Sequence, residues 1–264
     1  MSLVSYINGI SCIGPGIRDW RAAEHIFTGV TPYIASDTEL LAPLSLPAAE
    51  RRRAGRAIKL AISLGIEASS QAGLDPKSLL TVFSSSGGDG ENCDAICRTL
   101  ASVDRQLSPT RFHHSVHNVP AGYWSIATGA MAASTTLCAH DASFAAGLLE
   151  AMTQVTASAD PVLLVAYDTV YPSPLRDKRP IRHVLGIALV LDKQPGPRSI
   201  AKISALLGDN PVDYLANSTL DDLRAGTPAG RGLTLLDRLA RRQWGSVQLE
   251  YFESTTLTVT VNPC

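Results

Sequence analysis

The chain has 264 residues, of which 45% are hydrophobic and 18% charged, and its net charge at pH 7 is −1. This length and apolar content predict one large domain or two small ones around a sizeable core. The near-neutral charge argues against nucleic acid or a membrane surface as the main partner. We find neither an apolar run long enough to cross a bilayer nor a charged-then-apolar leader at the start.

The five cysteines have neither disulfide nor zinc-pair spacing. Cys93 and Cys97 share a face of an expected helix, but no His/Cys pair lies beside them. His114 and His117 would point to different faces of an extended segment. We therefore expect no metal site, and a reducing cytoplasm fits this cysteine usage best.

The first third of the chain begins with a strand, predicted over Leu3 to Ile10 by the alternation of apolar and polar residues. A helix starts at Asp19, and residues 31–47 read as irregular because prolines interrupt them. A second helix is expected from Leu46-Pro47 to Ala72. Its first half carries a basic cluster, which a solvated or ion-paired helix face would explain: Arg51, Arg52, Arg53, Arg56 and Lys59.

A buried strand is predicted at Leu79 to Phe83, followed by the glycine-rich loop 84–90 and a helix at Glu91 to Leu100. The central stretch, residues 108–151, then reads as an extended entry to His117, a helix at 118–128 and a strand at 134–138. A sharp turn at 139–141 leads into a helix at 142–155. Such a strand-to-helix turn exposes one side chain where backbone N–H groups favour negative charge, and enzymes place nucleophiles there.

The remaining chain continues the alternation of strands and helices. Apolar runs predict strands at 161–166, 183–191 and 200–207, with a polar loop at 168–182. Residues 217–229 are loop-like with a short helical piece, residues 233–244 form an amphipathic helix, and the segments 247–252 and 257–261 can pair as strands. This alternation predicts a layered α/β fold with a mixed sheet.

The central stretch resembles the β-ketoacyl synthases, the condensing enzymes of fatty-acid and polyketide assembly. The matching positions are Ser108, Pro109, Asn118, Ala121, Gly122, Ile126 and Gly129. The phrases FHHSVHN, AGYWSIATG and DASFAAGLLEA further resemble the chain-length-factor-like subunits of aryl polyene clusters. The resemblance covers about Ser2 to Leu207. It implies a thiolase-like α-β-α fold with a ketosynthase-like N-terminal half at 1–207 and a shortened C-terminal cap, packed on the same domain, at 208–264.

The resemblance places Asp141 at the position of the family's catalytic cysteine. A carboxylate cannot hold an acyl thioester, and after Asp141 the chain has a single histidine, His183, where the family needs a pair. The resemblance therefore implies a subunit that does not condense alone. Such a subunit would pair with a catalytic ketosynthase and help shape the tunnel for a growing polyketide chain. It would need no cofactor of its own, because phosphopantetheine arrives on an acyl carrier protein.

The family comparison also implies roles for individual positions. The substrate chain would be bordered by Arg111, His114, Ser115 and Phe144, and the partner contacted by Asn118, Trp124, Thr128, Ser134 and Thr136. The basic cluster at residues 51–59 would meet an acidic carrier protein, as an alternative to the solvated face. The glycine-rich loop would either shape the active-site region or permit tight packing under the turn.

Several alternatives stay open at this point. Asp141 is either a helix N-cap or a base or decarboxylation trigger. Cys138 is either a small buried hydrophobe or a displaced nucleophile. The chain as a whole could accordingly be an acyltransferase, decarboxylase or hydrolase that uses His140, Asp141 or Cys138, or a homodimeric scaffold.

Overall fold

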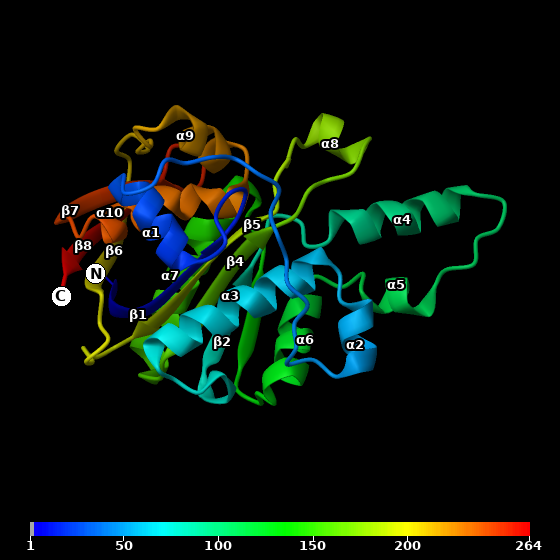
Figure 1. The fold of residues 1–264 in the computed structure, drawn as a ribbon, viewed down its shortest axis with the longest axis horizontal. Coiled ribbons are helices and arrows are strands. Elements are labelled where there is room, and N and C mark those ends of the chain that lie inside the picture. Colours follow the sequence, from blue (N-terminus) through cyan, green and yellow to red (C-terminus); the bar gives the residue numbers. More distant parts are fainter. Residues whose placement is uncertain (1–2) are drawn as a thin grey trace.

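A mixed sheet of eight strands runs through the molecule in the order β3-β2-β4-β5-β1-β6-β8-β7 (Figure 1). The computed structural model describes residues 3–264, so the expected domain start at residue 1 lies outside it. β2 runs parallel to β3 and β4, and the other neighbours are antiparallel. The strands are β1 (Leu3–Ile13), β2 (Leu80–Ser84), β3 (Ser134–Leu137), β4 (Val162–Asp168), β5 (Leu185–Asp192), β6 (Ala201–Gly208), β7 (Gly245–Glu250) and β8 (Thr256–Pro263).

Helices cover both faces of this sheet. α3 and α6 pack on one face, and α1, α7 and α10 pack on the other. The helices are α1 (Trp20–Thr28), α2 (Ala48–Arg53), α3 (Arg56–Ala72), α4 (Gly90–Ala101), α5 (Pro109–His113), α6 (Val119–Thr128), α7 (Ser143–Ser158), α8 (Leu175–Lys178), α9 (Ser218–Ala225) and α10 (Leu233–Ala240). Short 3₁₀ turns lie at η1 (Pro76–Ser78), η2 (His140–Ala142) and η3 (Pro228–Gly232).

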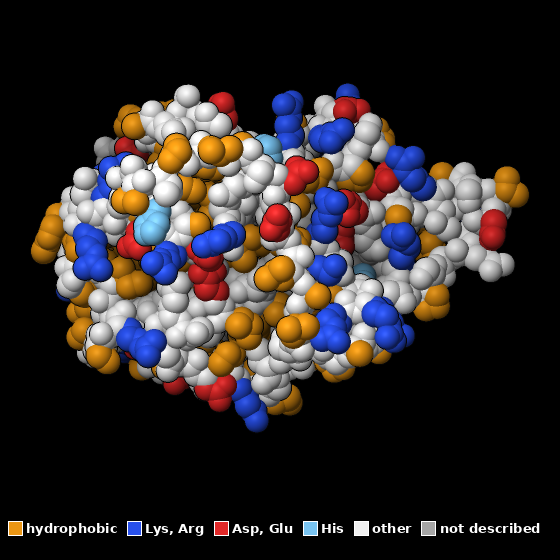
Figure 2. Space-filling model, in the orientation of Figure 1, with side chains coloured by type: hydrophobic (Ala, Val, Ile, Leu, Met, Phe, Trp, Pro, Cys, Tyr) orange, Lys and Arg blue, Asp and Glu red, His pale blue; other side chains and the backbone are white. Residues whose placement is uncertain are grey.

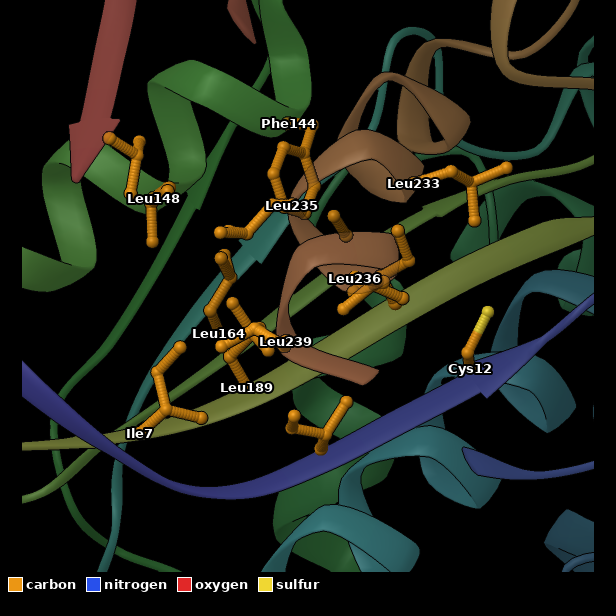
Figure 3. Close-up of a cluster of buried hydrophobic side chains, with 14 of the residues drawn as sticks. Ile7, Cys12, Phe144, Leu148, Leu164, Leu189, Leu233, Leu235, Leu236 and Leu239 are labelled. Carbon is orange, nitrogen blue, oxygen red and sulfur yellow. The ribbon is translucent and has the colours of Figure 1, made fainter. Parts of the chain in front are cut away.

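The core forms where the apolar runs of the sequence predicted doubly buried strands. Every residue of β4 is buried, as are all residues of β5 except its last. On the α7 side of the sheet, Phe144 and Leu148 from α7 lie among Leu235 and Leu239 from α10 (Figure 3). The two faces thus hold separate apolar clusters, which fix the sheet between two helical layers.

Two predicted elements differ from the structure. The expected continuous helix from Leu46 to Ala72 is two helices, because the chain becomes extended at Ala54 and Gly55. The expected extended entry at 108–117 contains α5, which opens at Pro109 with the proline in its first turn. Proline has a fixed φ that suits this helical position, so the Ser-Pro pair starts a helix here.

The C-terminal segment extends the sheet of the preceding residues. β8 pairs with β6, and β7 pairs with β8 in the predicted hairpin. The division at Leu207 stays a prediction, since the strands on its two sides share one sheet. The outer edge of β7 is partly covered, because Gln248 donates its N–H to Asp213 Oδ2 at 2.9 Å and accepts from the Asp213 N–H at 3.1 Å. At the other end of the sheet, β3 pairs with one strand, β2, among residues 3–264.

Two segments project from the body on the side of α2. One is the arm formed by α4, its following loop and α5. The other is the loop between β4 and β5, which carries α8 (Figure 1). Arg98 in α4 joins them by donating to the Ser173 carbonyl at 2.7 Å. No helix within residues 3–264 has the length and apolar character that crossing a membrane requires.

Candidate functional site

The three parallel strands β2, β3 and β4 have their carboxyl ends on the same side of the sheet, which we call the site edge to distinguish it from the outer edges of β3 and β7. β2 runs into the glycine-rich loop 84–90, β3 into the elbow at 138–142, and β4 ends at Asp168 before the α8 loop, which we define as residues 169–184. In open α/β sheets this edge is where functional sites form. The side chains from these three loops therefore define the candidate site.

The elbow turns most sharply at His140, whose φ of 52° lies in the left-handed region. That residue lies one position before Asp141, which the family comparison placed at the nucleophile. Ser143 stabilises the turn, because its hydroxyl accepts from the Ala139 N–H at 3.1 Å and donates to the His140 carbonyl at 2.7 Å. α7 begins after Ala142 and receives no side-chain cap, so the interpretation of Asp141 as an N-cap is wrong.

The Asp141 carboxylate is held by an arginine instead. Arg179 Nη2 donates to Asp141 Oδ1 at 2.8 Å and to Ser86 Oγ at 2.8 Å. Burial acts to raise the pKa of Asp141, but the hydrogen bond and charge of Arg179, aided by Arg231 and His140, lower it below its usual value. Asp141 is thus a charged partner in an ion pair at neutral pH.

Asp168 forms a second, fully buried carboxylate site beside the first. Its Oδ1 accepts from the Ser86 N–H at 2.9 Å and the Ser85 hydroxyl at 3.3 Å, and its Oδ2 accepts from the Ala229 N–H at 2.8 Å. Burial raises the pKa of Asp168 to about 7, despite these hydrogen bonds and the charge of Arg179. The carboxyl ties the glycine-rich loop to η3.

This raised pKa predicts a stability that falls with rising pH. The folded chain retains the Asp168 proton up to about pH 7, whereas the unfolded chain loses it near pH 4. Folding therefore binds a proton between these values, and its free energy weakens by about 3 kcal/mol across this window. Urea unfolding at several pH values should show the stability of wild type minus that of Asp168→Asn declining from pH 4.5 to 7.5. A difference independent of pH contradicts the assignment.

The glycine-rich loop serves close packing. A Cβ on Gly87 would lie 1.8 Å from the Tyr171 hydroxyl, and one on Gly90 would lie 2.6 Å from its ring. Tyr171 itself is buried and belongs to the α8 loop. Of the two readings of the glycines, tight packing next to the elbow is therefore the one that the structure favours.

The residues predicted to border the substrate are only partly brought together. Arg111 and His114 line a cavity of about 340 Å³ together with Arg53 and Arg56. Ser115 is exposed, and its hydroxyl donates to the Phe112 carbonyl at 2.7 Å. His114 also lies 2.8 Å from the Tyr123 hydroxyl, which donates to Glu50 Oε2 at 2.9 Å, so α5, α6 and α2 are linked.

Two of the predicted site residues are corrected. Phe144 is fully buried, and a Cβ on Gly232 would lie 2.4 Å from its ring, so it fills core space between α7 and η3 (Figure 3). Trp124 is 1% exposed and packs on Gly65 of α3, so it cannot contact a partner. Both aromatic rings belong to helix faces that turn toward the sheet.

The other predicted interface positions are accessible. Asn118 lines an apolar groove of about 490 Å³ between α5 and α6, which we call the α5–α6 groove. Ser134 is exposed on β3, while Thr128 and Thr136 are half-buried. Cys138 is exposed, so its interpretation as a buried hydrophobe is wrong. No group of three or more His, Cys, Asp or Glu side chains within residues 3–264 is arranged to hold a metal ion.

Sequence reasoning identified the basic cluster at residues 51–59 but missed Arg182 and His183 as its neighbours. Arg56 and Lys59 of α3 and Arg182 and His183 of the α8 loop line a cavity of about 600 Å³, which we call the basic cavity. Basic side chains also gather over α2, the start of α3 and the α8 loop in Figure 2. Arg179 was missed as well, although the cation-rich run RDKRPIR at residues 176–182, in the loop that follows β4, was a usable signal.

The family model for the β-ketoacyl synthase N-terminal domain matches residues 27–243. The chain belongs to this family. No curated protein matches it. The mixed sheet with helices on both faces confirms the thiolase-like ketosynthase fold that the family resemblance implied.

Solved structures share this ketosynthase fold over their full length. One is the ketosynthase ApeO in complex with its chain length factor ApeC from Xenorhabdus doucetiae, at 22% identity and a TM-score of 0.74, covering 98% of this chain and 99% of that one. The ishigamide ketosynthase/chain length factor gives 12% identity and 0.72, covering 98% and 99%. The AntDE:AntF complex of a type II ketosynthase with its acyl carrier protein gives 12% and 0.76, covering 100% of both. These likenesses establish the fold.

Proposed function

We propose that this chain is a non-catalytic, chain-length-factor-like subunit that pairs with a catalytic ketosynthase in polyketide biosynthesis of the aryl polyene type. The observation that carries this proposal is the elbow, where the family's nucleophile would stand. Its carboxylate is engaged by Arg179 at 2.8 Å, and a carboxylate cannot carry an acyl thioester. The partner supplies the reactive cysteine and the histidine pair.

An exposed apolar face supports the pairing. Phe112, Val116 and Ile126 are 66%, 56% and 49% exposed around the α5–α6 groove, and Met131, in the turn leading to β3, is 93% exposed. A contiguous face of this kind is typical of a protein–protein interface. β3 continues it at the sheet edge, where the partner can add backbone hydrogen bonds.

The basic cavity supports a second contact, with an acyl carrier protein. Arg52 and Arg53 of α2 are exposed close in sequence to Arg56 and Lys59, which line the cavity. Arg53 and Arg56 are partly neutralised by Glu50 at 3.0 Å and Glu91 at 3.4 Å. The remaining cations suit an acidic carrier surface and the phosphate of its phosphopantetheine arm.

The solved complexes support the same reading. Two of the structures that share this fold pair a ketosynthase with a chain length factor, and a third holds a ketosynthase with its acyl carrier protein. We extend these partnerships to the present chain. The cytoplasm is the compartment that we propose for it, because carrier-bound substrates and reduced cysteines suit that location.

Co-expression with the ketosynthase of the same gene cluster tests this function. We expect a stable heterodimer whose ketosynthase loses condensation when this chain is omitted. The isolated chain should take up no radiolabelled malonyl or acyl group. Labelling that disappears in Cys138→Ala would identify Cys138 as a nucleophile and support an acyltransferase instead, while a homodimer that ignores the ketosynthase would support a scaffold.

A further inference from the structure

The three loops at the site edge are bound to one another by side chains of the chain itself. Asp168 binds the glycine-rich loop, Tyr171 packs on Gly87 and Gly90, and Arg179 reaches both the elbow and the glycine-rich loop. The α8 loop supplies Tyr171 and Arg179. It is also closed on itself, because the Tyr171 N–H donates to the Ile181 carbonyl at 3.0 Å.

Arg179 makes the contact that joins all three loops at one atom. Its Nη2 lies 2.8 Å from both Ser86 Oγ and Asp141 Oδ1, and its side chain is only 21% exposed. Charge-assisted hydrogen bonds at this distance are stronger than neutral ones, and partial burial limits screening by salt. The α8 loop also accepts two hydrogen bonds from other segments, because Arg98 of α4 donates to the Ser173 carbonyl and the Thr38 hydroxyl donates to the Val184 carbonyl.

We propose that Arg179 is a positioning residue and that Asp141 is its anchor: the carboxylate at the former nucleophile position now fixes the α8 loop. The residue at the elbow thereby holds a loop in place instead of taking part in a reaction. Arg182 and His183 follow Arg179 by three and four residues and line the basic cavity, so the ion pair sets where these cations stand. This last consequence for carrier binding rests on the proposed function, whereas the ion pair itself does not.

Hydrogen exchange on the isolated full chain tests the proposal without any partner. In Asp141→Asn and in Arg179→Met, the amides of Tyr171 and Ile181 should exchange roughly tenfold faster than in wild type, as expected when one charge-assisted bond is lost. The double variant should exchange no faster than Arg179→Met alone, because that substitution already removes the bond to Asp141 together with the bond to Ser86. Arg179→Lys keeps the charge and should recover part of the protection.

Arg176→Met is the matched control, since Arg176 is an exposed arginine of the same loop. It should leave the exchange of Tyr171 and Ile181 unchanged. The proposal fails if Asp141→Asn does not alter these exchange rates, or if Arg176→Met accelerates exchange equally. It also fails if the effects of Asp141→Asn and Arg179→Met on exchange add in the double variant. Circular dichroism checks folding, and the isosteric Asp141→Asn keeps the test decisive should Arg179→Met unfold. If the chain failed to bind a ketosynthase, that result would refute the proposed function. It would not change the exchange rates measured on the isolated chain, so the two failures are distinguishable.

Discussion

Ile126→Arg should abolish pairing with the ketosynthase while the chain stays folded. Ile126 is 49% exposed and lines the α5–α6 groove. A partner that covers the exposed half of Ile126 gains about 1 kcal/mol from its burial, and an unpaired arginine at the same place adds a desolvation cost of several kcal/mol. Affinity measured by surface plasmon resonance with immobilised ketosynthase should fall at least about 100-fold.

Leu206→Arg is the control for this prediction. Leu206 is 48% exposed, so the two positions match in exposure, but it lies on β6 toward the opposite end of the sheet. It should leave the affinity within about twofold, because surface substitutions away from the interface have small effects. If Ile126→Arg bound the ketosynthase with wild-type affinity, the α5–α6 groove would not be part of the interface.

Trp124→Ala should destabilise the isolated chain by about 3–5 kcal/mol, because a large aromatic side chain is removed from a closed core. Trp124 is 1% exposed and lies against Gly65 on α3. Urea unfolding of the chain without its partner measures the loss. A nearly unchanged stability would show that Trp124 is not a core residue and would support the interface role that the family comparison implied.

A second substitution checks that this loss comes from the α3–α6 contact. A Cβ on Gly65 would lie 2.5 Å from Cζ3 of Trp124, so Gly65→Ala should destabilise wild type. In the Trp124→Ala background the same methyl group has room, and alanine is the better helix former by about 1 kcal/mol. Gly65→Ala should then be neutral or stabilising, and equal effects in both backgrounds would contradict the contact.

The sequence predicted the architecture well where periodicity and apolar runs are strong. The fully apolar run at 161–166 overlaps β4, which begins at Val162, and the alternating segments at 247–252 and 257–261 correspond to the β7–β8 hairpin. Boundaries failed where single residues compete with a pattern. The bend at Ala54–Gly55 interrupts an otherwise continuous amphipathic helix, and Pro109 starts a helix inside a segment expected to be extended.

The site was harder to predict because its contacts join residues far apart in sequence. Asp141 was identified through the family, but its partner Arg179 lies 38 residues later, in a loop without periodicity. The burial of Phe144 and Trp124 depends on which helix face meets the sheet, and the exposure of Cys138 depends on how the chain leaves β3; a family position alone specifies neither. A half-buried carboxylate at the elbow nevertheless favours a counterion, and the cation-rich loop after β4 was the place to seek it.

The two ends of the sheet differ in a way that limits assembly. Asp213 occupies the middle of the outer edge of β7, whereas among residues 3–264 β3 has a strand on one side only. Asp213 therefore hinders extension of the sheet at the β7 end, whereas the edge of β3 is open to pairing. Association of this kind stops at a closed pair, and open-ended fibres, which need two adhesive edges per molecule, are disfavoured.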